Sequence, residues 1–217
     1  MGKVVFNMSM SLDGFVAGPN DGLENGLGDG GERLFAWYNS GDTEYKTPGG
    51  DWRFKTSAAS AAHLQRLIET TGALLTGRRT FDIAGAWGGQ HPLDVPVVVL
   101  THHPPQEWTR EGSPFTFVTD GIQRAVEQAR ALAGDKNVAV GTASTMQQCL
   151  AAGLLDEIHI DLTPVVLGGG VRLFDQLGAG PIRLEQLDAV KGQDVTHISY
   201  RVVRQRGDSG RSGGMPG

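Results

Sequence analysis

The sequence contains a single cysteine, Cys149, so no disulfide can form within the chain. It also lacks pairs of Cys or His at the spacing that structural zinc sites use, and we expect no bound metal. No run of about eighteen apolar residues is long enough for a membrane-spanning helix. The opening residues lack the apolar core and cleavage site of a secretory leader. These absences predict a cytoplasmic protein that does not contact a membrane.

Dense basic runs are absent as well. The 19 Lys and Arg residues are outnumbered by 24 Asp and Glu residues, which gives a formal net charge of -5. We therefore expect no nucleic-acid partner. With 217 residues, 39% of them hydrophobic, the chain can bury a full core. No repeat or linker interrupts residues 1–204, which predicts one domain followed by a flexible, Gly-rich tail at 205–217.

Short apolar runs alternate with amphipathic helical patterns along the first two thirds of the chain. The apolar runs lie at residues 4–11, 74–75, 97–100, 115–118 and 138–140. Helical spacing of apolar residues occurs at 61–68, 122–132 and 146–150. Strands that alternate with helices predict an α/β fold with a parallel sheet.

The pattern changes after Gly153. Apolar and polar residues alternate from Ile158 to Leu162, and residues 182–190 and 195–203 are further extended segments. This alternation predicts antiparallel or mixed strands at the C-terminal end. An irregular, Gly-rich insert is expected at about residues 24–60.

Three strand ends run into segments that suit anion binding. In the first, Leu74-Leu75 is followed by Thr76-Gly77-Arg78-Arg79-Thr80, where a helix is expected to begin near Thr80. Free amides at a helix start attract phosphate, and two guanidinium groups add charge-assisted hydrogen bonds. The alternative is an ordinary helix start with solvated arginines.

The second segment is the small-residue turn Gly141-Thr142-Ala143-Ser144-Thr145, which follows an apolar strand. Small side chains let a pyrophosphate approach the backbone closely. Ser144 and Gln147 have the spacing of a capping box. An ordinary capped helix explains the same pattern.

The third segment is Leu100-Thr101-His102-His103, which two prolines follow. Its hydroxyl and imidazoles suit contact with an adenosine phosphate, and two exposed loop histidines are the alternative. If the sheet is parallel, all three segments lie at its carboxyl edge, where ligands of open α/β sheets bind.

Six segments carry a resemblance to a known family. In sequence order they are Met10–Gly14, Thr76–Phe81, Leu100–Thr101, Val140–Ser144, Gly153–Ile158 and Pro164–Gly170. Together they resemble the dihydrofolate reductase-like superfamily over residues 3–203, apart from about 24–60. The closest branch looks like the C-terminal reductase domain of the riboflavin-biosynthesis bifunctional deaminase/reductase. The resemblance implies an eight-stranded, mostly parallel mixed sheet flanked by helices, with antiparallel C-terminal strands.

The resemblance also implies a cofactor, NADPH, and places it. The nicotinamide would lie beside Ala17 and Gly18, and the central phosphates at Gly141–Thr145. The remaining cofactor-binding residues implied by the likeness are Thr76, Gly77, Arg78, Arg79, Thr80, Leu100, Thr101 and His102. The arginines would meet the pyrophosphate and the 2′-phosphate, and Thr101 and His102 the adenosine end.

The activity implied by the resemblance is NADPH-dependent reduction, with 5-amino-6-(5-phosphoribosylamino)uracil as the leading substrate. Dihydrofolate, another small heterocycle or carbonyl, and NADP or flavin binding without turnover remain alternatives. Dihydrofolate reductases place a carboxylate on the helix before the Gly-Arg turn, whereas this chain has Ala58-Ala59-Ser60-Ala61-Ala62. The riboflavin branch usually has an acidic residue before its small-residue turn, where this chain has Val140.

Three residues are candidates for contact with the substrate. Asp13, in the Ser-Leu-Asp-Gly turn, is the catalytic candidate, because its carboxylate can orient a polar group or handle a proton. The alternative is a turn residue that stabilises its own backbone. Ser11 and Trp87 are the other two candidates.

The insert carries an unusual aromatic load, namely Trp37, Tyr38, Tyr45, Trp52 and Phe54. Two interpretations are open: a wall or lid of the substrate site, or a satellite hydrophobic cluster that holds the long loop, which we favour. By family likeness, and because the late strands are apolar, we also expect a homodimer.

Overall fold

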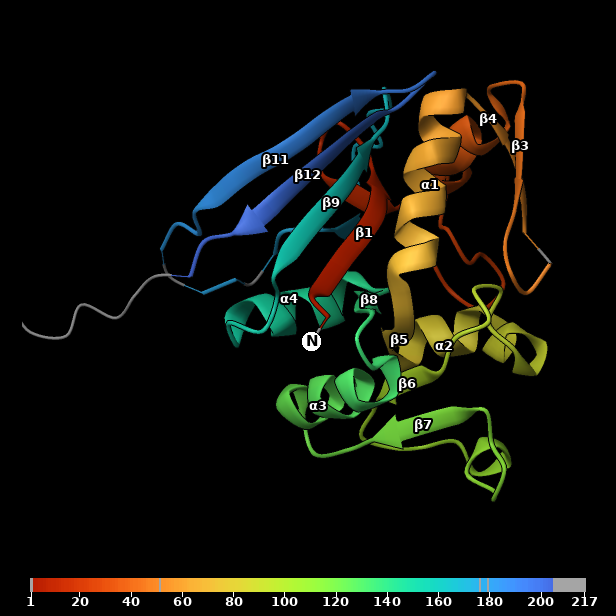
Figure 1. The fold of residues 1–217 in the computed structure, drawn as a ribbon, viewed down its shortest axis with the longest axis vertical. Coiled ribbons are helices and arrows are strands. Elements are labelled where there is room, and N and C mark those ends of the chain that lie inside the picture. Colours follow the sequence, from red (N-terminus) through yellow and green to blue (C-terminus); the bar gives the residue numbers. More distant parts are fainter. Residues whose placement is uncertain (1, 51, 176, 179, 205–217) are drawn as a thin grey trace, which may run out of the picture.

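The computed structural model describes residues 2–50, 52–175, 177, 178 and 180–204. Its largest element is an eight-stranded sheet with the order β11-β12-β9-β1-β8-β5-β6-β7 (Figure 1). The strands are β1 (Val4–Met10), β5 (Thr71–Gly77), β6 (Val97–Leu100), β7 (Phe115–Val118), β8 (Asn137–Val140), β9 (Glu157–Leu162), β11 (Leu184–Lys191) and β12 (Thr196–Val202). The predicted tail at 205–217 lies outside the described residues.

The strand directions confirm the predicted fold class. Strand β1 pairs in parallel with β8 and β9, and β5 pairs in parallel with β8 and β6, which in turn pairs in parallel with β7. At the C-terminal end, β12 pairs antiparallel with both β9 and β11. The carboxyl ends of the six central parallel strands therefore meet at one edge.

Helices cover both faces of the sheet (Figure 1). Helices α3 (Ile122–Ala133) and α4 (Ala143–Ala151) pack in the main core with Ala73, Leu75 and Val98. Helices α1 (Ala58–Thr70) and α2 (Arg78–Ile83) lie on the opposite face, where Phe81 of α2 packs with Leu74. Neighbouring residues of one strand point to opposite faces, so Leu74 and Leu75 of β5 pack on opposite sides of the sheet.

The insert is more regular than the sequence indicates. It contains a 3-10 helix, η1 (Gly31–Asn39), and an antiparallel hairpin of β3 (Thr43–Lys46) and β4 (Arg53–Thr56), and α1 already begins at Ala58. The expectation of an irregular segment over 24–60 was therefore wrong for these parts. Tyr45 and Phe54, which are paired across the hairpin, supply its apolar contacts. One large apolar residue per strand is too few to give a periodic signal.

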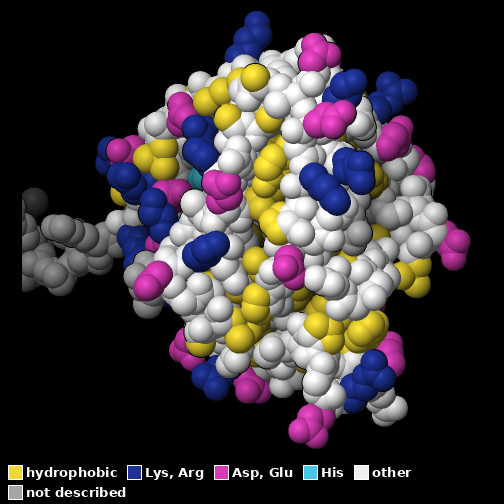
Figure 2. Space-filling model, turned by 45° about the vertical axis from the view of Figure 1, so that its right-hand side comes forward, with side chains coloured by type: hydrophobic (Ala, Val, Ile, Leu, Met, Phe, Trp, Pro, Cys, Tyr) yellow, Lys and Arg dark blue, Asp and Glu magenta, His cyan; other side chains and the backbone are white. Residues whose placement is uncertain are grey.

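Four shorter elements complete the chain. They are β2 (Phe15–Ala17), β10 (Val171–Arg172), η2 (Gly85–Gly89) and η3 (Gln106–Trp108). Basic and acidic side chains are interspersed over the face shown in Figure 2. Within the described part of the chain, no helix has the length and apolar character needed to cross a membrane.

Candidate active site

A cavity of about 830 Å³ follows the carboxyl ends of the parallel strands. Met8 lines it on β1, Gly141 after β8, Gly77 after β5, Thr101 after β6 and Thr119 after β7. Because the sheet order is β1-β8-β5-β6-β7, the cavity crosses five neighbouring strand ends. The three turns singled out in the sequence thus lie along one edge, as predicted.

Most of the predicted cofactor-binding residues line this cavity. They are Ala17, Gly77, Arg78, Arg79, Thr80, Leu100, Thr101, His102, Gly141, Thr142, Ala143, Ser144 and Thr145. Two others, Gly18 and Thr76, lie behind the cavity wall and are buried. The Thr76 hydroxyl has no hydrogen-bond partner among the described residues. That these residues bind a cofactor stays a prediction.

Both arginines of the β5–α2 turn donate hydrogen bonds to oxygen atoms of the protein. The Nε of Arg78 donates to the two carboxylate oxygens of Asp82 at 2.7 and 2.8 Å, and its Nη1 donates to the carbonyl of His103. Arg79 crosses the mouth of the cavity, where its Nη2 lies 3.0 Å from the carboxylate of Asp21. Its side chain is 64% exposed, so this pair is an exchangeable surface contact.

Helix α4 begins two residues earlier than its sequence pattern indicates. Its N-cap is Thr142, whose Oγ1 accepts a hydrogen bond from the amide of Thr145. The expected cap at Ser144 was therefore wrong, and Ser144 is exposed in the cavity instead. Gln147 turns away and donates to the carbonyl of Leu173 at 2.9 Å. The threonine cap satisfies an orphan amide of the helix start, that of Thr145, as a serine cap at 144 would have done for the amide of Gln147.

Gly77 brings the first two turns into contact. A Cβ atom at this position would lie 3.3 Å from Oγ1 of Thr145 and 3.5 Å from Oγ1 of Thr142. Any larger residue would fill the space between the β5 end and the start of α4.

Hydrophobic side chains close the β1 end of the cavity. Met8, Val16, Leu27, Phe35 and Val171 line it there, and we call them the apolar wall. Sequence reasoning missed these residues, since they come from four separate elements and one loop. The strand pair that joins Ala17 to Val171 holds two of those elements together.

Asp13 is anchored to the segment that follows β9. Its carboxylate accepts hydrogen bonds from the amides of Leu167, at 3.1 Å, and Gly168, at 2.7 Å. A hydrogen bond from Ser11 and these backbone amides lower the pKa of Asp13 to about 2. The group is thus ionised at neutral pH and is poorly suited to donate a proton. Neither Asp13 nor the buried Ser11 lines the cavity.

Trp87 lies away from the cavity. It belongs to the Gly85–Gly89 segment, and its ring packs edge-on against Phe81 and His91. Burial lowers the pKa of His91 to about 4. The expected contact of Trp87 with substrate has no support in this position.

The aromatic residues of the insert form the satellite cluster that the sequence analysis favoured. Trp37, Tyr38, Tyr45 and Phe54 pack together with Leu64 of α1 and Val195. Trp52 lies apart, in edge contact with His91. Phe35 is the aromatic residue of the insert that lines the cavity, and the sequence did not distinguish it.

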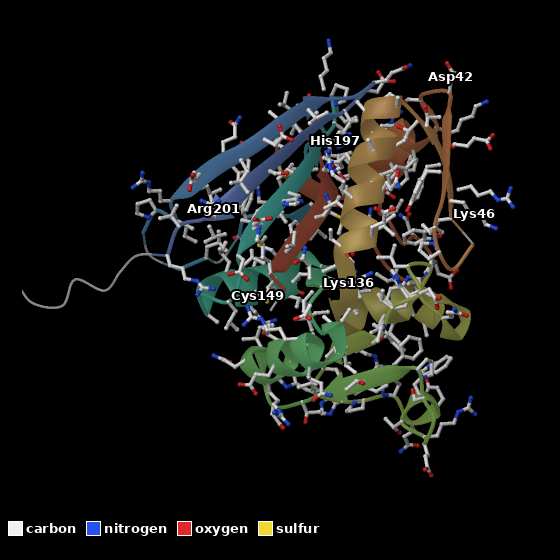
Figure 3. The ribbon with its side chains drawn as sticks, viewed as in Figure 1. Asp42, Lys46, Lys136, Cys149, His197 and Arg201 are labelled. Atoms are coloured by element: carbon white, nitrogen blue, oxygen red, sulfur yellow. The ribbon has the colours of Figure 1, made fainter. Side chains whose placement is uncertain are left out.

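A second polar cluster is buried between α1 and the sheet. Oδ1 of Asp161 on β9 accepts from Nδ1 of His197 on β12 at 2.6 Å and lies 3.2 Å from Nε2 of His63 on α1. The two imidazole rings stack at 4.1 Å, and Nε2 of His197 lies 2.8 Å from Oγ of Ser60. Figure 3 shows His197 between α1 and the sheet.

This His-Asp-His group, which we call the histidine cluster, has the composition of a metal site. His197 is bonded to Asp161 and Ser60, and Asn7 donates to the other oxygen of Asp161 at 3.2 Å, whereas Nε2 of His63 has no well-formed hydrogen bond among the described residues. Burial favours the neutral form of Asp161, but hydrogen bonds from His197 and His63 hold its pKa below the usual range. The cluster therefore functions as a structural link. Sequence reasoning found no signal at His63.

Cys149 is fully buried on α4, and burial raises the pKa of its thiol to about 12. A thiol that is neutral and inaccessible is a core residue and not a nucleophile, as expected.

Comparison with known proteins gives a family match. The model of the RibD C-terminal domain matches residues 2–198. A search of curated proteins gives no significant match.

Solved structures share the fold. A riboflavin biosynthesis protein from Shewanella sp. PV-4 is similar, with 22% identity, a TM-score of 0.69, and coverage of 94% of this chain and 100% of that one. Dihydrofolate reductase from Enterococcus faecalis, complexed with NADP(H) and RAB-propyl, has 14% identity and a TM-score of 0.51, over 93% of this chain and 96% of that one.

A third structure has two activities in its description. It is the diaminohydroxyphosphoribosylaminopyrimidine deaminase/5-amino-6-(5-phosphoribosylamino)uracil reductase from Thermotoga maritima. It has 12% identity and a TM-score of 0.55, with coverage of 93% of this chain and 57% of that one. At such identities these likenesses establish the fold and leave the substrate open.

Proposed function

The chain belongs to the RibD C-terminal domain family, and from this premise we propose that it is an NADPH-dependent reductase that transfers hydride to a small heterocyclic or sugar-linked substrate. One observation carries the proposal: the cavity joins five strand ends, with anion-binding groups at one end and an apolar wall at the other. A dinucleotide needs this combination, because its phosphates require donors and its nicotinamide ring requires an apolar site.

The residues along the cavity fit a dinucleotide. Small residues at Gly77, Gly141 and Ala143 leave room for a pyrophosphate beside the backbone. The amides of Ala143 and Ser144, the first two of α4, have no carbonyl within the helix to bind. Arg78 and Arg79 supply charge for the 2′-phosphate. In this role Arg79 exchanges its contact with Asp21 for the cofactor. The Enterococcus faecalis neighbour is described as an NADP(H) complex, which agrees with this assignment.

The chemistry requires few reactive side chains. NADPH supplies the hydride when bound, and the protein orients the two reactants and excludes water. Ala17 and the apolar wall position the rings, while Asp13 holds the segment after β9 against the β1–β2 turn. Asp13 is thus proposed as a positioning residue, and the proton comes from water.

Binding of NADPH tests the cofactor assignment. Ala143→Glu places a bulky, negatively charged group in the small-residue turn and should abolish NADPH binding in a calorimetric titration. Ala151→Glu, at the exposed end of the same helix, is the matched control and should bind normally. Normal binding by a folded Ala143→Glu protein would contradict the assignment.

The first substrate to test is 5-amino-6-(5-phosphoribosylamino)uracil, which the description of the Thermotoga maritima neighbour names. Reduction would transfer hydride to the imine-like carbon of its opened ribose. Loss of NADPH absorbance on its addition measures turnover. We expect negligible turnover of dihydrofolate, because the buried face of α1 carries Ser60 and His63 where a carboxylate would be needed.

We also propose a homodimer. Strand β11 is at the free edge of the sheet, and Leu184 and Leu187 on it are 36% and 38% exposed (Figure 1). An uncovered edge with apolar side chains favours pairing with a second copy. Sedimentation at micromolar concentration should give a species near twice 23.1 kDa. A single species at the monomer mass would refute the dimer.

A further inference from the structure

We propose that the substrate end of the cavity binds an uncharged, planar and largely apolar ring, such as a conjugated cyclic ketone, and discriminates against phosphorylated substrates. This inference rests on the proposed reductase function and names the substrate class for it. The reaction balances as hydride transfer from NADPH to the electron-poor carbon and a proton from water to the oxygen, which yields NADP⁺ and the alcohol.

The apolar wall is the first observation. Its residues Met8, Val16, Leu27, Phe35 and Val171 surround the β1 end of the cavity, where the nicotinamide is placed. A substrate that receives hydride lies against the nicotinamide and therefore against this wall. Aliphatic side chains stabilise a ligand in proportion to the apolar area that it buries.

Phe35 gives the wall a flat aromatic surface. Its side chain is half-buried on η1, with one side open to the cavity and the ring of Tyr38 at 5.6 Å. An aromatic ring held in place by a second one is suited to stacking on a planar ligand.

The distribution of cations is the second observation. Among the described residues that line the cavity, Arg78 and Arg79 are the only Lys or Arg side chains. Both follow β5, which β8 separates from β1, and both are assigned to the cofactor. Asp21 is an anionic group in the lining. A phosphate bound beside the apolar wall would thus lose its hydration without gaining a cation, which is strongly unfavourable.

Two other arginines come near in sequence but do not line the cavity. The guanidinium of Arg172, next to Val171, lies over the Phe15 ring at 4.6 Å. Arg33, on η1, is 73% exposed, and its nearest carboxylate is that of Glu32 at 4.0 Å. Neither arginine therefore supplies charge at the wall.

A pair of probes that differ in charge tests the inference. Isatin is a planar, uncharged ring with an electron-poor carbonyl, and isatin-5-sulfonate is its anionic counterpart. Titration of each into the NADP⁺-loaded protein should show isatin binding about tenfold more tightly, since the sulfonate lacks a charge-assisted partner. 5-Amino-6-(5-phosphoribosylamino)uracil should bind more weakly than isatin as well.

Three variants make the comparison of the two probes sharper. Leu27→Lys places a cation in the apolar wall and should reduce or reverse the difference in affinity between isatin and isatin-5-sulfonate. Leu23→Lys lies in the same loop, is exposed and does not line the cavity, so it should leave the difference unchanged. Phe35→Ala should weaken isatin binding by a larger factor than NADPH binding, because the cofactor keeps its phosphate contacts at the other end of the cavity.

The outcomes separate this inference from the proposed function. If NADPH itself does not bind, the reductase proposal fails. If NADPH binds normally but isatin-5-sulfonate or the phosphoribosyl compound binds the parent protein as tightly as isatin, the substrate class proposed for the wall is wrong. Normal NADPH binding with no binding of isatin overturns the substrate class in the same way.

Discussion

The carboxyl-edge cavity and the histidine cluster both concentrate polar groups, but they use them differently. In the cavity, Ser144 and His102 face open space, and the exposed Arg79 is paired with the largely buried carboxylate of Asp21, a contact that it can exchange. In the histidine cluster, Asp161 and His197 are each 1% exposed and are bonded to each other at 2.6 Å. Polar groups that face a cavity are free for a ligand, whereas buried groups that satisfy one another hold elements together.

The two regions also lie on different parts of the architecture. The polar cavity residues Arg79, His102 and Ser144 lie in or beside turns that follow strands, so substituting them changes little of the core. The histidine cluster joins α1, β9 and β12, three elements that are far apart in sequence. Substitutions in the cavity should therefore change ligand binding, and substitutions in the histidine cluster should change the free energy of unfolding.

The largest effect is expected at Asp161. Replacing it by Asn leaves two buried imidazoles without their carboxylate, and the free energy of unfolding should fall by about 3 kcal/mol. Chemical denaturation measures the change. Asp188→Asn, on the exposed strand β11, is the control and should change stability by less than about 0.5 kcal/mol.

A milder substitution in the same cluster checks this interpretation. Ser60→Ala removes the hydroxyl that lies 2.8 Å from Nε2 of His197 and should cost about 1 kcal/mol. Both variants should retain parental NADPH affinity at a temperature where they are folded. If the Asp161→Asn protein is as stable as the parent, the histidine cluster is not a structural link.

The next effect concerns cofactor choice. Arg78→Ala combined with Arg79→Ala should lower the affinity for NADPH by about tenfold or more and leave that for NADH nearly unchanged, because only NADPH has the 2′-phosphate. Calorimetric titration of both cofactors measures the preference. A double variant that prefers NADPH as strongly as the parent would refute the assigned phosphate site.

Acidification should lower the stability of the protein through Asp161 of the histidine cluster. The folded-state pKa of Asp161 is below its ordinary value of 3.8, so its ionised form stabilises the protein above about pH 4 and this contribution is lost as the pH falls. The parent should therefore lose stability on acidification more steeply than Asp161→Asn. Unfolding curves between pH 6 and pH 3, taken at about one-unit steps, check this. Equal slopes would contradict the prediction.

The sequence was informative where a feature depends on local pattern. All eight strands of the main sheet were visible as apolar or alternating runs, since a strand buried on both faces is continuous in hydrophobicity. The small-residue turn at Gly141 and the arginine pair were visible for the same reason. Their arrangement along one edge followed from the parallel topology.

The sequence did not predict features that depend on contacts between residues far apart in the chain. Phe35 and Val171 come together through the pairing of β2 with β10 and the position of η1, which no local pattern encodes. His63 and His197 are isolated histidines in the sequence, and their partner Asp161 becomes evident only when three elements pack. Asp13 had two open interpretations, contact with substrate and stabilisation of its own turn, and neither anticipated its bonds to the distant Leu167 and Gly168.

The smallest effect is expected where an ion pair lies in the cavity itself. Asp21 binds Arg79 at the mouth of the cavity and so competes with the cofactor phosphate for that guanidinium. Asp21→Asn should raise the affinity for NADPH about threefold and change the free energy of unfolding by less than about 0.5 kcal/mol, because the arginine of the pair is largely exposed. Glu127→Gln breaks an ion pair with Arg124 on α3 in which both side chains are exposed, outside the cavity, and should change neither quantity. Titration and denaturation of the two variants side by side measure both effects. A large loss of stability in Asp21→Asn, or an unchanged affinity for NADPH, would show that the Asp21–Arg79 pair belongs with the fixed contacts of the histidine cluster and not with the exchangeable contacts of the cavity.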